Sequence, residues 1–305
     1  MPIQELLHVT DEIKNAIAAK RPVVALESTV IAHGLPRPTN LETAKRLEQI
    51  IKEREAIPAT IGLLAGKLCV GLGEQELKLI AESDDIKKIS TRDLAIAVAN
   101  RWHGATTVAS TIWIAHRAGI KVFATGGIGG VHRGSLPDIS ADLPELARTP
   151  MIVVCSGAKI VLDLPATREW LETHAVTLVG YECDELPAFY SRSSGLAVDA
   201  RADTAAEVAR IFQAQRALGV EGALLVTVPV PADAEVRAEE LSAILDQALA
   251  AAKYSEVHGR ELTPFLLSSM AQQSGGATLK ANIALLENNA RVAAEIACAL
   301  AAPVV

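Results

Sequence analysis

The chain has 305 residues, of which 50% are hydrophobic and 3% aromatic, and its formal net charge is −7. A chain of this length and composition can bury a large core. The negative charge and the scarcity of aromatic rings argue against a nucleic-acid-binding protein, because such proteins need basic surfaces and rings on which bases stack.

The cysteines and the N-terminal residues indicate a reducing compartment. Four cysteines lie far apart in the chain and form neither a disulfide framework nor a zinc motif. The first residues lack the basic and then apolar pattern of a signal peptide. No apolar run approaches the ~18 residues that span a bilayer. We therefore expect a cytoplasmic protein with no role at a membrane.

Segments typical of strands and of helices alternate along the chain. Short apolar runs bounded by turn residues predict strands at 22–27, 57–64, 66–72, 86–90, 120–125, 151–155, 176–181 and 223–228. Helical periodicity predicts helices from Thr39, where Thr39-x-x-Glu42 is interpreted as a capping box, and over 73–83, 94–100 and 110–117.

The C-terminal third is helix-rich, with helices predicted over 234–256, 263–273 and 279–301. No long linker, charge run or internal repeat divides the chain, so we expect residues 1–305 to form one domain. Alternating strands and helices predict a three-layer α/β/α fold, in which a mostly parallel or mixed sheet is covered on both faces. Ligands of such sheets bind beyond the carboxyl ends of the strands. Glu27, Lys88, Thr125 and Lys159 fall at or near predicted strand ends and should therefore converge.

Two of these residues suit covalent chemistry. Lys159 follows an apolar run through a turn of small residues. Burial there disfavours the charged form of a lysine and frees its amine to attack an aldehyde-like carbon. Glu27 ends an apolar strand, so its pKa should be raised, as a general acid requires. Alternatively, Glu27 caps the turn at Ser28 and Thr29, and Lys88 alone is explained by a solvated strand end.

Three further motifs each have two interpretations. The loop Gly126-Gly-Ile-Gly-Gly130 follows a strand, so it either wraps an anion or makes a tight turn with positive φ; it matches neither a dinucleotide fingerprint nor a P-loop. The stretch 104–111 has four hydroxyl side chains, which suit phosphate binding or plain helix capping. Asp138 and Asp142 would share one face of a helical turn, which suits Mg²⁺ or Mn²⁺ or simply an acidic helix N-terminus.

Longer stretches resemble the pseudouridine-5′-phosphate glycosidase family, also named indigoidine synthase A-like, from about residue 5 to residue 300. They are Ala25-Leu-Glu-Ser-Thr29, Pro58-Ala-Thr-Ile61, Ile89-Ser-Thr-Arg-Asp93, Gly104-Ala-Thr-Thr-Val-Ala-Ser-Thr111, Phe123-Ala-Thr-Gly-Gly-Ile-Gly-Gly-Val-His-Arg-Gly134, Asp138-Ile-Ser-Ala-Asp142, Cys155-Ser-Gly-Ala-Lys159, Leu186-Pro-Ala-Phe189, Thr263-Pro-Phe-Leu-Leu267 and Leu279-Lys-Ala-Asn282.

The resemblance implies a cytoplasmic, homotrimeric enzyme of pseudouridine catabolism, of the glycosidase, hydrolase or lyase type. It would reversibly cleave the C–C glycosidic bond of pseudouridine 5′-phosphate to uracil and ribose 5-phosphate, through a lysine Schiff base and with one Mn²⁺ per subunit. The resemblance gives each matching residue a role: Lys159 is the covalent nucleophile, Glu27 the proton donor, Asp138 the metal ligand, and the substrate-binding residues are Lys88, Val108, Thr125, His132, Ser140, Ala141, Asp142 and Asn282.

Two departures from the family pattern leave details of the pocket open. This chain has Val228-Pro-Val-Pro231 where the family often has Asn-Pro-Ile-Pro, and the loop between His132 and Asp138 is two residues shorter than in some members. The alternatives are another lysine Schiff-base lyase of the aldolase type, acting on a phosphorylated sugar, or a non-catalytic sugar-phosphate-binding protein.

Overall fold

The structure is a computed structural model that describes residues 3–134, 138–257 and 262–302. Its centre is an 11-stranded sheet. The strands of this sheet are β1 (Leu7–Val9), β2 (Val23–Leu26), β3 (Ile57–Leu64), β4 (Lys67–Val70), β5 (Lys87–Ile89), β6 (Gly104–Thr106), β7 (Val122–Ala124), β9 (Ile152–Cys155), β11 (Thr177–Tyr181), β12 (Ala200–Ala202) and β13 (Leu224–Thr227). A separate two-stranded sheet pairs β8 (Val131–His132) with β10 (Leu162–Asp163).

The strand order is β1-β4-β3-β2-β7-β9-β13-β11-β12, with β6 paired to β3 and β5 to β6. All pairs are parallel except those of β3 with β4 and with β6, so the sheet is mixed and mostly parallel, as predicted. Strands β2, β7, β9 and β13 are buried at every residue. This burial explains their continuous apolar sequences, because both faces of a central parallel strand are covered.

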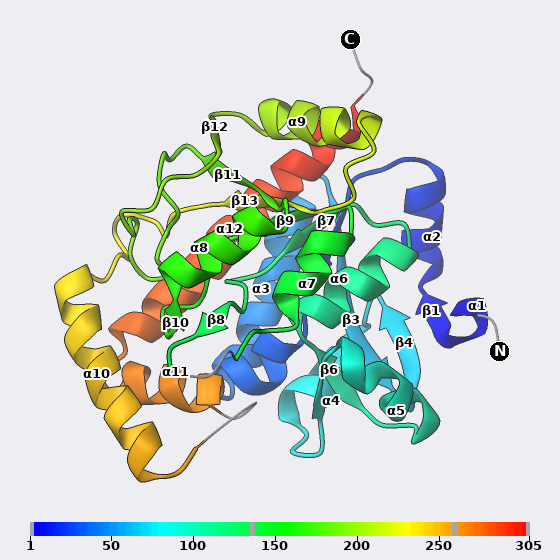
Figure 1. Ribbon diagram of the computed structural model, residues 1–305. Coiled ribbons are helices and arrows are strands. Elements are labelled where there is room, and N and C mark those ends of the chain that lie inside the picture. The colour runs from blue at the N-terminus through cyan, green and yellow to red at the C-terminus, as the bar shows by residue number, and fades with distance from the viewer. Residues whose placement is uncertain (1–2, 135–137, 258–261, 303–305) are drawn as a thin grey trace.

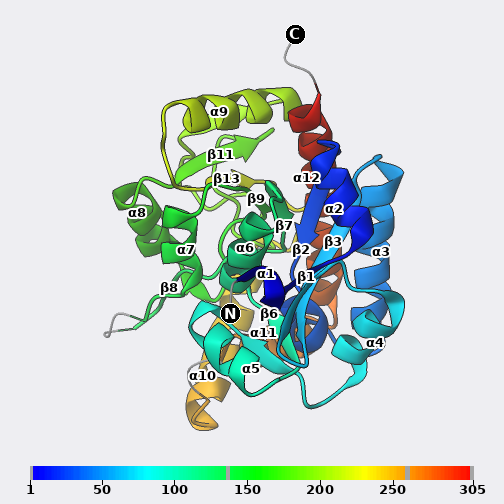
Figure 2. The ribbon, with the colours of Figure 1, turned by 90° about the vertical axis from the view of Figure 1, so that its right-hand side faces the viewer.

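Helices cover both faces of the sheet and complete the three predicted layers. The helical elements are α1 (Ile3–Leu6), α2 (Asp11–Ala18), a π-helix η1 (Val30–Gly34), α3 (Thr39–Glu53), α4 (Glu74–Glu82), a 3₁₀-helix η2 (Thr91–Asp93), α5 (Leu94–Ala99), α6 (Val108–Arg117), α7 (Asp142–Arg148), α8 (Leu164–Thr173), α9 (Ala205–Ala217), α10 (Ala238–Tyr254), α11 (Leu262–Gln273) and α12 (Ala277–Ala301). In Figure 2, α6, α7 and α8 lie on one side of the sheet and α3 and α12 on the other.

Helix α12 is the longest helix of the described chain and crosses the middle of the molecule (Figure 1). It packs against β2, β7 and β9 and against the neighbouring helices α3 and α9. No helix among the described residues is both long and apolar enough to cross a bilayer.

The predicted capping box at the start of α3 was wrong. Helix α3 begins at Thr39, but its N-cap residue is Pro38 and no side chain caps it. The neighbouring Asn40 instead donates 2.9 Å hydrogen bonds to the carbonyls of Ile31 and Ala81, which tie η1 and α4 to α3. The stretch 104–111 does lie at a helix start, as expected: residues 104–106 form strand β6, Thr107 is the N-cap residue and α6 begins at Val108.

The sheet has a topological switch point at β2. After β2 the chain continues to β3 on one side, and it returns on the other side as β7. Connections that leave in opposite directions open a crevice at the carboxyl ends of the two strands, and ligands of open α/β sheets bind there. Glu27 directly follows β2 and Thr125 directly follows β7, so both lie at this crevice.

Candidate active site

Glu27 is a buried carboxyl group at the end of β2, with 7% of its surface exposed. The Thr125 hydroxyl donates a short hydrogen bond to its Oε1 atom across the switch point. Burial raises the pKa of Glu27 above its usual value; Asp142 adds to this increase, whereas Lys159, Thr125 and Lys88 oppose it. Four of the residues predicted to converge therefore do so, and the carboxyl group has the raised pKa that a general acid needs.

Lys159 is positioned by a turn that follows β9 and pairs with the glycine loop. Its N–H donates to the Ile128 carbonyl at 3.1 Å, and the Ile128 N–H donates to the Gly157 carbonyl at 3.0 Å. The Ser156 N–H donates to the Gly126 carbonyl at 2.9 Å. These bonds fix the backbone of the lysine against the segment that follows β7. Lys159 and Glu27 therefore follow β9 and β2, the two strands that flank β7 in the sheet.

The glycines of the loop 126–130 are needed because there is no room for a Cβ atom at most of these positions, and not because the backbone has positive φ. None of its four glycines has positive φ, so the turn interpretation was wrong in that respect. A Cβ would lie 2.7 Å from the Phe189 ring at Gly127, 2.2 Å from Ser140 at Gly129 and 2.4 Å from Thr167 at Gly130. Two of the loop N–H groups, those of Ile128 and Gly129, bond to the protein itself, so only part of the loop is left to contact an anion.

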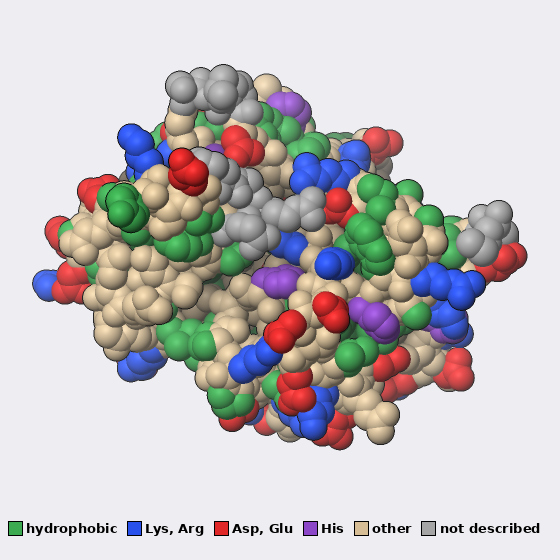
Figure 3. All heavy atoms as spheres, turned by 90° about the horizontal axis from the view of Figure 1, so that it is seen from below, with side chains coloured by type: hydrophobic (Ala, Val, Ile, Leu, Met, Phe, Trp, Pro, Cys, Tyr) green, Lys and Arg blue, Asp and Glu red, His purple; other side chains and the backbone are tan. Residues whose placement is uncertain are grey.

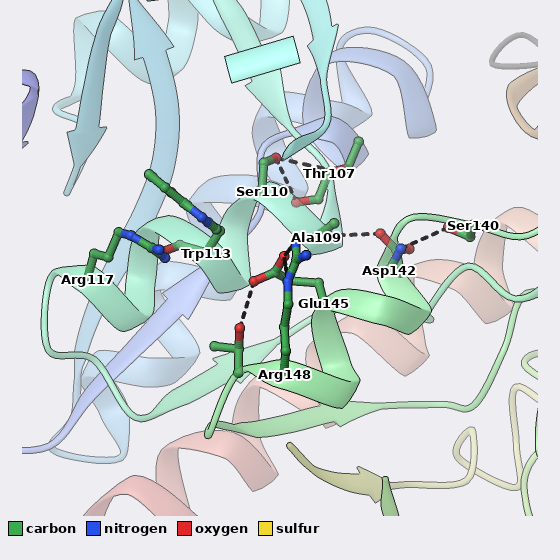
Figure 4. A network of polar contacts seen from close by, with 10 residues as sticks. Thr107, Ala109, Ser110, Trp113, Arg117, Ser140, Asp142, Glu145 and Arg148 are labelled. Atoms are coloured by element: carbon green, nitrogen blue, oxygen red, sulfur yellow. Dashed lines mark hydrogen bonds and ion pairs between the residues drawn. The ribbon is translucent and has the colours of Figure 1, made fainter. Parts of the chain in front are cut away.

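Asp142 links three walls of the site. It begins α7, and its two carboxylate oxygens accept hydrogen bonds from the N–H of Ala109 in α6 at 2.9 Å and of Gly129 at 2.8 Å. Figure 4 shows its side chain pointing from the start of α7 to the first turn of α6. Asp138 lies in the non-helical segment before α7 and not on a helical turn with Asp142, so the predicted shared helical face was wrong.

The predicted site residues surround one cavity of about 320 Å³. Thr125 does not line the cavity, but its hydroxyl bonds to Glu27, which does. The other predicted residues line the cavity: Glu27, Lys88, Val108, His132, Asp138, Ser140, Ala141, Asp142, Lys159 and Asn282. Two elements that contribute lining residues, β8 and α11, lie in the lower half of Figure 1. The face seen from below is hollowed near its centre, with basic, acidic and histidine side chains around the hollow (Figure 3).

Sequence reasoning missed several lining residues. The family-like motifs of residues 89–93, 186–189 and 263–267 had been given no role, yet each contributes to the wall. The missed residues include His33, Ser90, Arg92, Asp93, Phe189, Thr263, Pro264 and Leu267. His33 has no metal-ligand spacing with another histidine in the sequence, but the π-helix η1, which begins soon after Glu27, brings it to the cavity. Such helices occur often at functional sites.

Val228, where the chain departs from the family pattern, does not line this cavity. Val228 is 2% exposed and lines a separate cavity of about 230 Å³ together with Tyr181, Arg192 and Arg291. The shortened loop before Asp138 includes residues 135–137, which lie outside the described residues.

The donor set for a metal ion consists of few protein groups. In the described ranges, no three His, Cys, Asp or Glu side chains form a cluster that could hold an ion. Asp138 is exposed and lines the cavity. One carboxylate in an open pocket suits Mg²⁺ or Mn²⁺, because these ions keep several waters and take their remaining ligands from substrate phosphates.

Comparison with known proteins identifies close relatives. The family described as indigoidine synthase A like protein matches residues 12–299. The pseudouridine-5′-phosphate glycosidase of Geobacillus kaustophilus is 50% identical over 297 residues, covering 97% of this chain and 99% of its own. That of Kosmotoga olearia is 51% identical over 281 residues, covering 92% and 97%.

Two solved structures share the fold. The prealnumycin C-glycosynthase AlnA, in complex with ribulose 5-phosphate, superposes with a TM-score of 0.89 at 42% identity and covers 97% of each chain. An indigoidine synthase A-like protein from Thermotoga maritima gives a TM-score of 0.89 at 39% identity, again covering 97% of each chain.

Proposed function

The chain belongs to the indigoidine synthase A like family, and we propose that it reversibly cleaves the C–C glycosidic bond of pseudouridine 5′-phosphate to give uracil and ribose 5-phosphate. One observation carries this proposal: a buried glutamate with raised pKa and a lysine lie in one cavity at the switch point of the sheet. The names of relatives that are about half identical over nearly the whole chain supply the substrate.

A carbon–carbon bond explains why the site needs a lysine. A carbon leaving group has no lone pair to protonate, so the usual mechanism with two carboxylates does not apply. In our scheme Lys159 Nζ attacks C1′ of the ribose, the C1′–O4′ bond breaks, and O4′ takes a proton. The sugar is then an open chain that is joined to the enzyme through nitrogen.

Glu27 supplies the proton that releases the base. Its proton goes to C5 of uracil, using the electrons of the C5–C6 double bond. The C1′–C5 bond then breaks, its electrons restore that double bond, and the nitrogen lone pair forms an imine with C1′. Water hydrolyses the imine, which returns the free lysine and releases ribose 5-phosphate. The reverse reaction begins from the imine and uracil.

The remaining lining residues suit a phosphorylated sugar. Lys88 and Arg92 bring positive charge to the cavity wall, and the first turn of α6 contributes Val108 beside its N-cap residue Thr107. Helix N-termini attract anions through the helix dipole and through N–H groups that are left unpaired; in α6 the Ala109 N–H is already bonded to Asp142, so the dipole and the two cationic side chains support the assignment. We assign the phosphate to this end of the cavity, and AlnA, which was solved with a pentose phosphate, supports that class of ligand.

A divalent ion fits this scheme as a weakly held partner. We propose one Mn²⁺ per subunit, held by Asp138, by water and by oxygens of the substrate. When bound, the ion neutralises negative charge on the substrate. The proton transfer and the covalent chemistry stay with Glu27 and Lys159.

Product analysis tests the proposal. The purified protein is incubated with Mn²⁺, uracil and ribose 5-phosphate, with and without EDTA, and the products are separated by chromatography. We expect metal-dependent formation of pseudouridine 5′-phosphate. Absence of this product from a folded, metal-loaded protein would refute the function, and wild-type turnover by Lys159→Ala would refute the covalent scheme.

Borohydride trapping separates the two alternatives from this function. An aldolase-type lyase would form a trappable imine but ignore uracil. A sugar-phosphate-binding protein would bind ribose 5-phosphate and leave no reduced adduct on Lys159. We expect an adduct with ribose 5-phosphate whose amount falls when uracil is added, because uracil consumes the imine.

We further propose that the enzyme works as a homotrimer in the cytoplasm. The proposal rests on the family resemblance and on cysteines that are all free among the described residues. Light scattering coupled to size-exclusion chromatography measures the mass of the assembly, and a monomer or dimer at working concentration would contradict the trimer.

A further inference from the structure

Two asparagines on α12 lie along one face of the helix, and only the first has a role so far. Asn282 is 6% exposed and lines the cavity. Asn289 follows seven residues later, about two helical turns, so it lies on the same side of the helix as Asn282. Its side chain is completely buried. Asn289 does not line the cavity. A buried amide in an otherwise apolar layer is costly unless it is hydrogen-bonded.

The carboxamide of Asn289 bonds to the two segments that carry the catalytic pair. Its Nδ2 donates to the carbonyl of Thr125 at 2.8 Å and, at a longer 3.4 Å, to that of Gly126. Its Oδ1 accepts from the Ser156 hydroxyl at 3.2 Å, and Nδ2 lies 3.1 Å from the same hydroxyl oxygen. The amide therefore bridges the carboxyl ends of β7 and β9 from beneath the cavity.

Each residue bonded to Asn289 is linked to one member of the catalytic pair, either by a hydrogen bond or by a short stretch of chain. Thr125 donates the short hydrogen bond to Glu27. Ser156 begins the turn that ends at Lys159, and its carbonyl accepts the N–H of Phe189 at 3.1 Å, which places a wall residue of the cavity. Ser156 is itself completely buried, so water does not compete for these bonds. One side chain thus contacts both of the segments that lead to the acid and to the nucleophile.

We propose that Asn289 is a positioning residue for the reaction, whose carboxamide holds Thr125 and Ser156 so that Glu27 and Lys159 keep their productive separation. The inference rests on the proposed function. Asn289 touches no substrate, so its loss should change turnover far more than binding. Misplacing reacting groups by about 1 Å can lower rates by ~100-fold.

Asn289→Asp and Asn289→Leu test the inference, with Asn288→Leu as the matched control. The aspartate keeps the acceptor and the size but places a carboxylate against two carbonyl oxygens, and the leucine removes the bridge. Asn288 lies on the same helix, but its amide donates to the Pro229 carbonyl at 3.3 Å, beside the separate cavity. We expect kcat to fall by ~10- to 100-fold in both Asn289 variants, with KM for ribose 5-phosphate changed less than about twofold, and Asn288→Leu to retain wild-type kcat.

Two readouts distinguish positioning from a merely structural role. Titration with ribose 5-phosphate counts the folded sites, and kcat is expressed per site. The hydrogen bond from Thr125 lowers the pKa of Glu27. If the Asn289 variants displace Thr125 and this bond is lost, the pKa of Glu27 rises, and the limb of the kcat/KM profile that reports Glu27 should move to higher pH. An unshifted profile, or a loss of activity that matches the loss of folded sites, would overturn the inference.

Ser156→Ala keeps the test decisive if the Asn289 variants do not fold. It removes one partner and leaves the bond to the Thr125 carbonyl, so we expect a smaller loss of kcat and a slower reduction of Lys159 by borohydride. Wild-type rates in Ser156→Ala would count against the inference. A wild-type protein that makes no pseudouridine 5′-phosphate would instead contradict the proposed function, which separates the two failures.

Discussion

Glu27 is a buried carboxyl group that must hold a proton at neutral pH to act as the acid. Burial raises its pKa, so the folded chain keeps a proton that the unfolded chain has already released. Above the unfolded value near ~4.3, the folded state is therefore destabilised as pH rises, until pH exceeds the folded pKa. Glu27 therefore lowers the free energy of unfolding at the neutral pH at which it is expected to act as the acid.

Replacement of Glu27 by glutamine should separate activity from stability. The amide of the new side chain would still accept the hydrogen bond from Thr125 but has no proton to give. We expect turnover by Glu27→Gln to fall by ~10²- to 10⁴-fold. We also expect its melting temperature to exceed that of the wild type at pH 8, and the difference to disappear near pH 4. A variant less stable at pH 8 in calorimetry would contradict this account of Glu27.

Asp138 should govern metal affinity and leave the fold unchanged, because its side chain is exposed. We expect Asp138→Asn to weaken Mn²⁺ binding at least about tenfold, since a neutral amide is a poorer ligand for a hard cation than a carboxylate. Electron paramagnetic resonance of free Mn²⁺ measures binding directly, without an assay of turnover. Equal affinities in variant and wild type would exclude Asp138 as the ligand.

At the scale of single residues, the sequence pointed to Glu27, which directly follows β2, and to Lys159, which lies one turn after β9. Glu27 and Lys159 were found because an apolar run that ends in a charged residue is visible locally. Asn289 and Phe189 were not assigned roles, because their functions depend on contacts with segments distant in the chain: Asn289 bonds to residues more than 130 positions away. Helical periodicity gives no sign of such a contact.

Among the elements, the turn between β9 and Lys159 depends on one glycine. Gly157 has a φ of +83°, and a Cβ there would lie 2.2 Å from the Pro187 carbonyl oxygen. Gly195 has a similar φ of +75° but nothing within 4 Å of its Cβ position. Alanine at Gly195 therefore measures the stability cost of positive φ alone, whereas alanine at Gly157 adds the cost of the contact with Pro187.

We expect Gly195→Ala to lower the free energy of unfolding by about 1 kcal/mol, the usual cost of a left-handed conformation. Gly157→Ala should cost at least about twice as much and should also slow imine formation by Lys159, because the turn must move. Urea denaturation measures the first effect and borohydride trapping the second. Equal losses in the two variants would show that the Pro187 contact is unimportant.

Most long elements agree with the sequence prediction, and the differences lie in short ones. Strands β2, β3 and β9 and helices α3 and α12 match the predicted periodic segments closely. Strands β1, β8, β10 and β12 have only two or three residues, too few for a pattern to repeat. Asp138 and Asp142 were expected on one helical turn, but α7 begins only at Asp142, whose carboxylate bonds to backbone groups of two other segments.

The whole molecule should unfold as one unit if residues 1–305 form a single domain. Its sheet is continuous from β1 to β12, and α12 packs on the central strands and on helices of both halves. We therefore expect a single calorimetric transition, raised by ribose 5-phosphate; at 100 times its dissociation constant the ligand adds about 2.7 kcal/mol. Two separable transitions, only one of them shifted by the ligand, would contradict the single domain.

The position of α12 also has a consequence for biosynthesis. A ribosome makes Glu27 and Lys159 well before α12, whose residues Asn282 and Asn289 complete the cavity and bridge the strands beneath it. Until α12 docks, the apolar face of β2, β7 and β9 lacks its cover, and chaperones can bind it. If Asn289 positions the acid and the amine as proposed, the two groups are aligned only once α12 has docked, and an incomplete chain does not expose an activated lysine to the aldehydes of the cell.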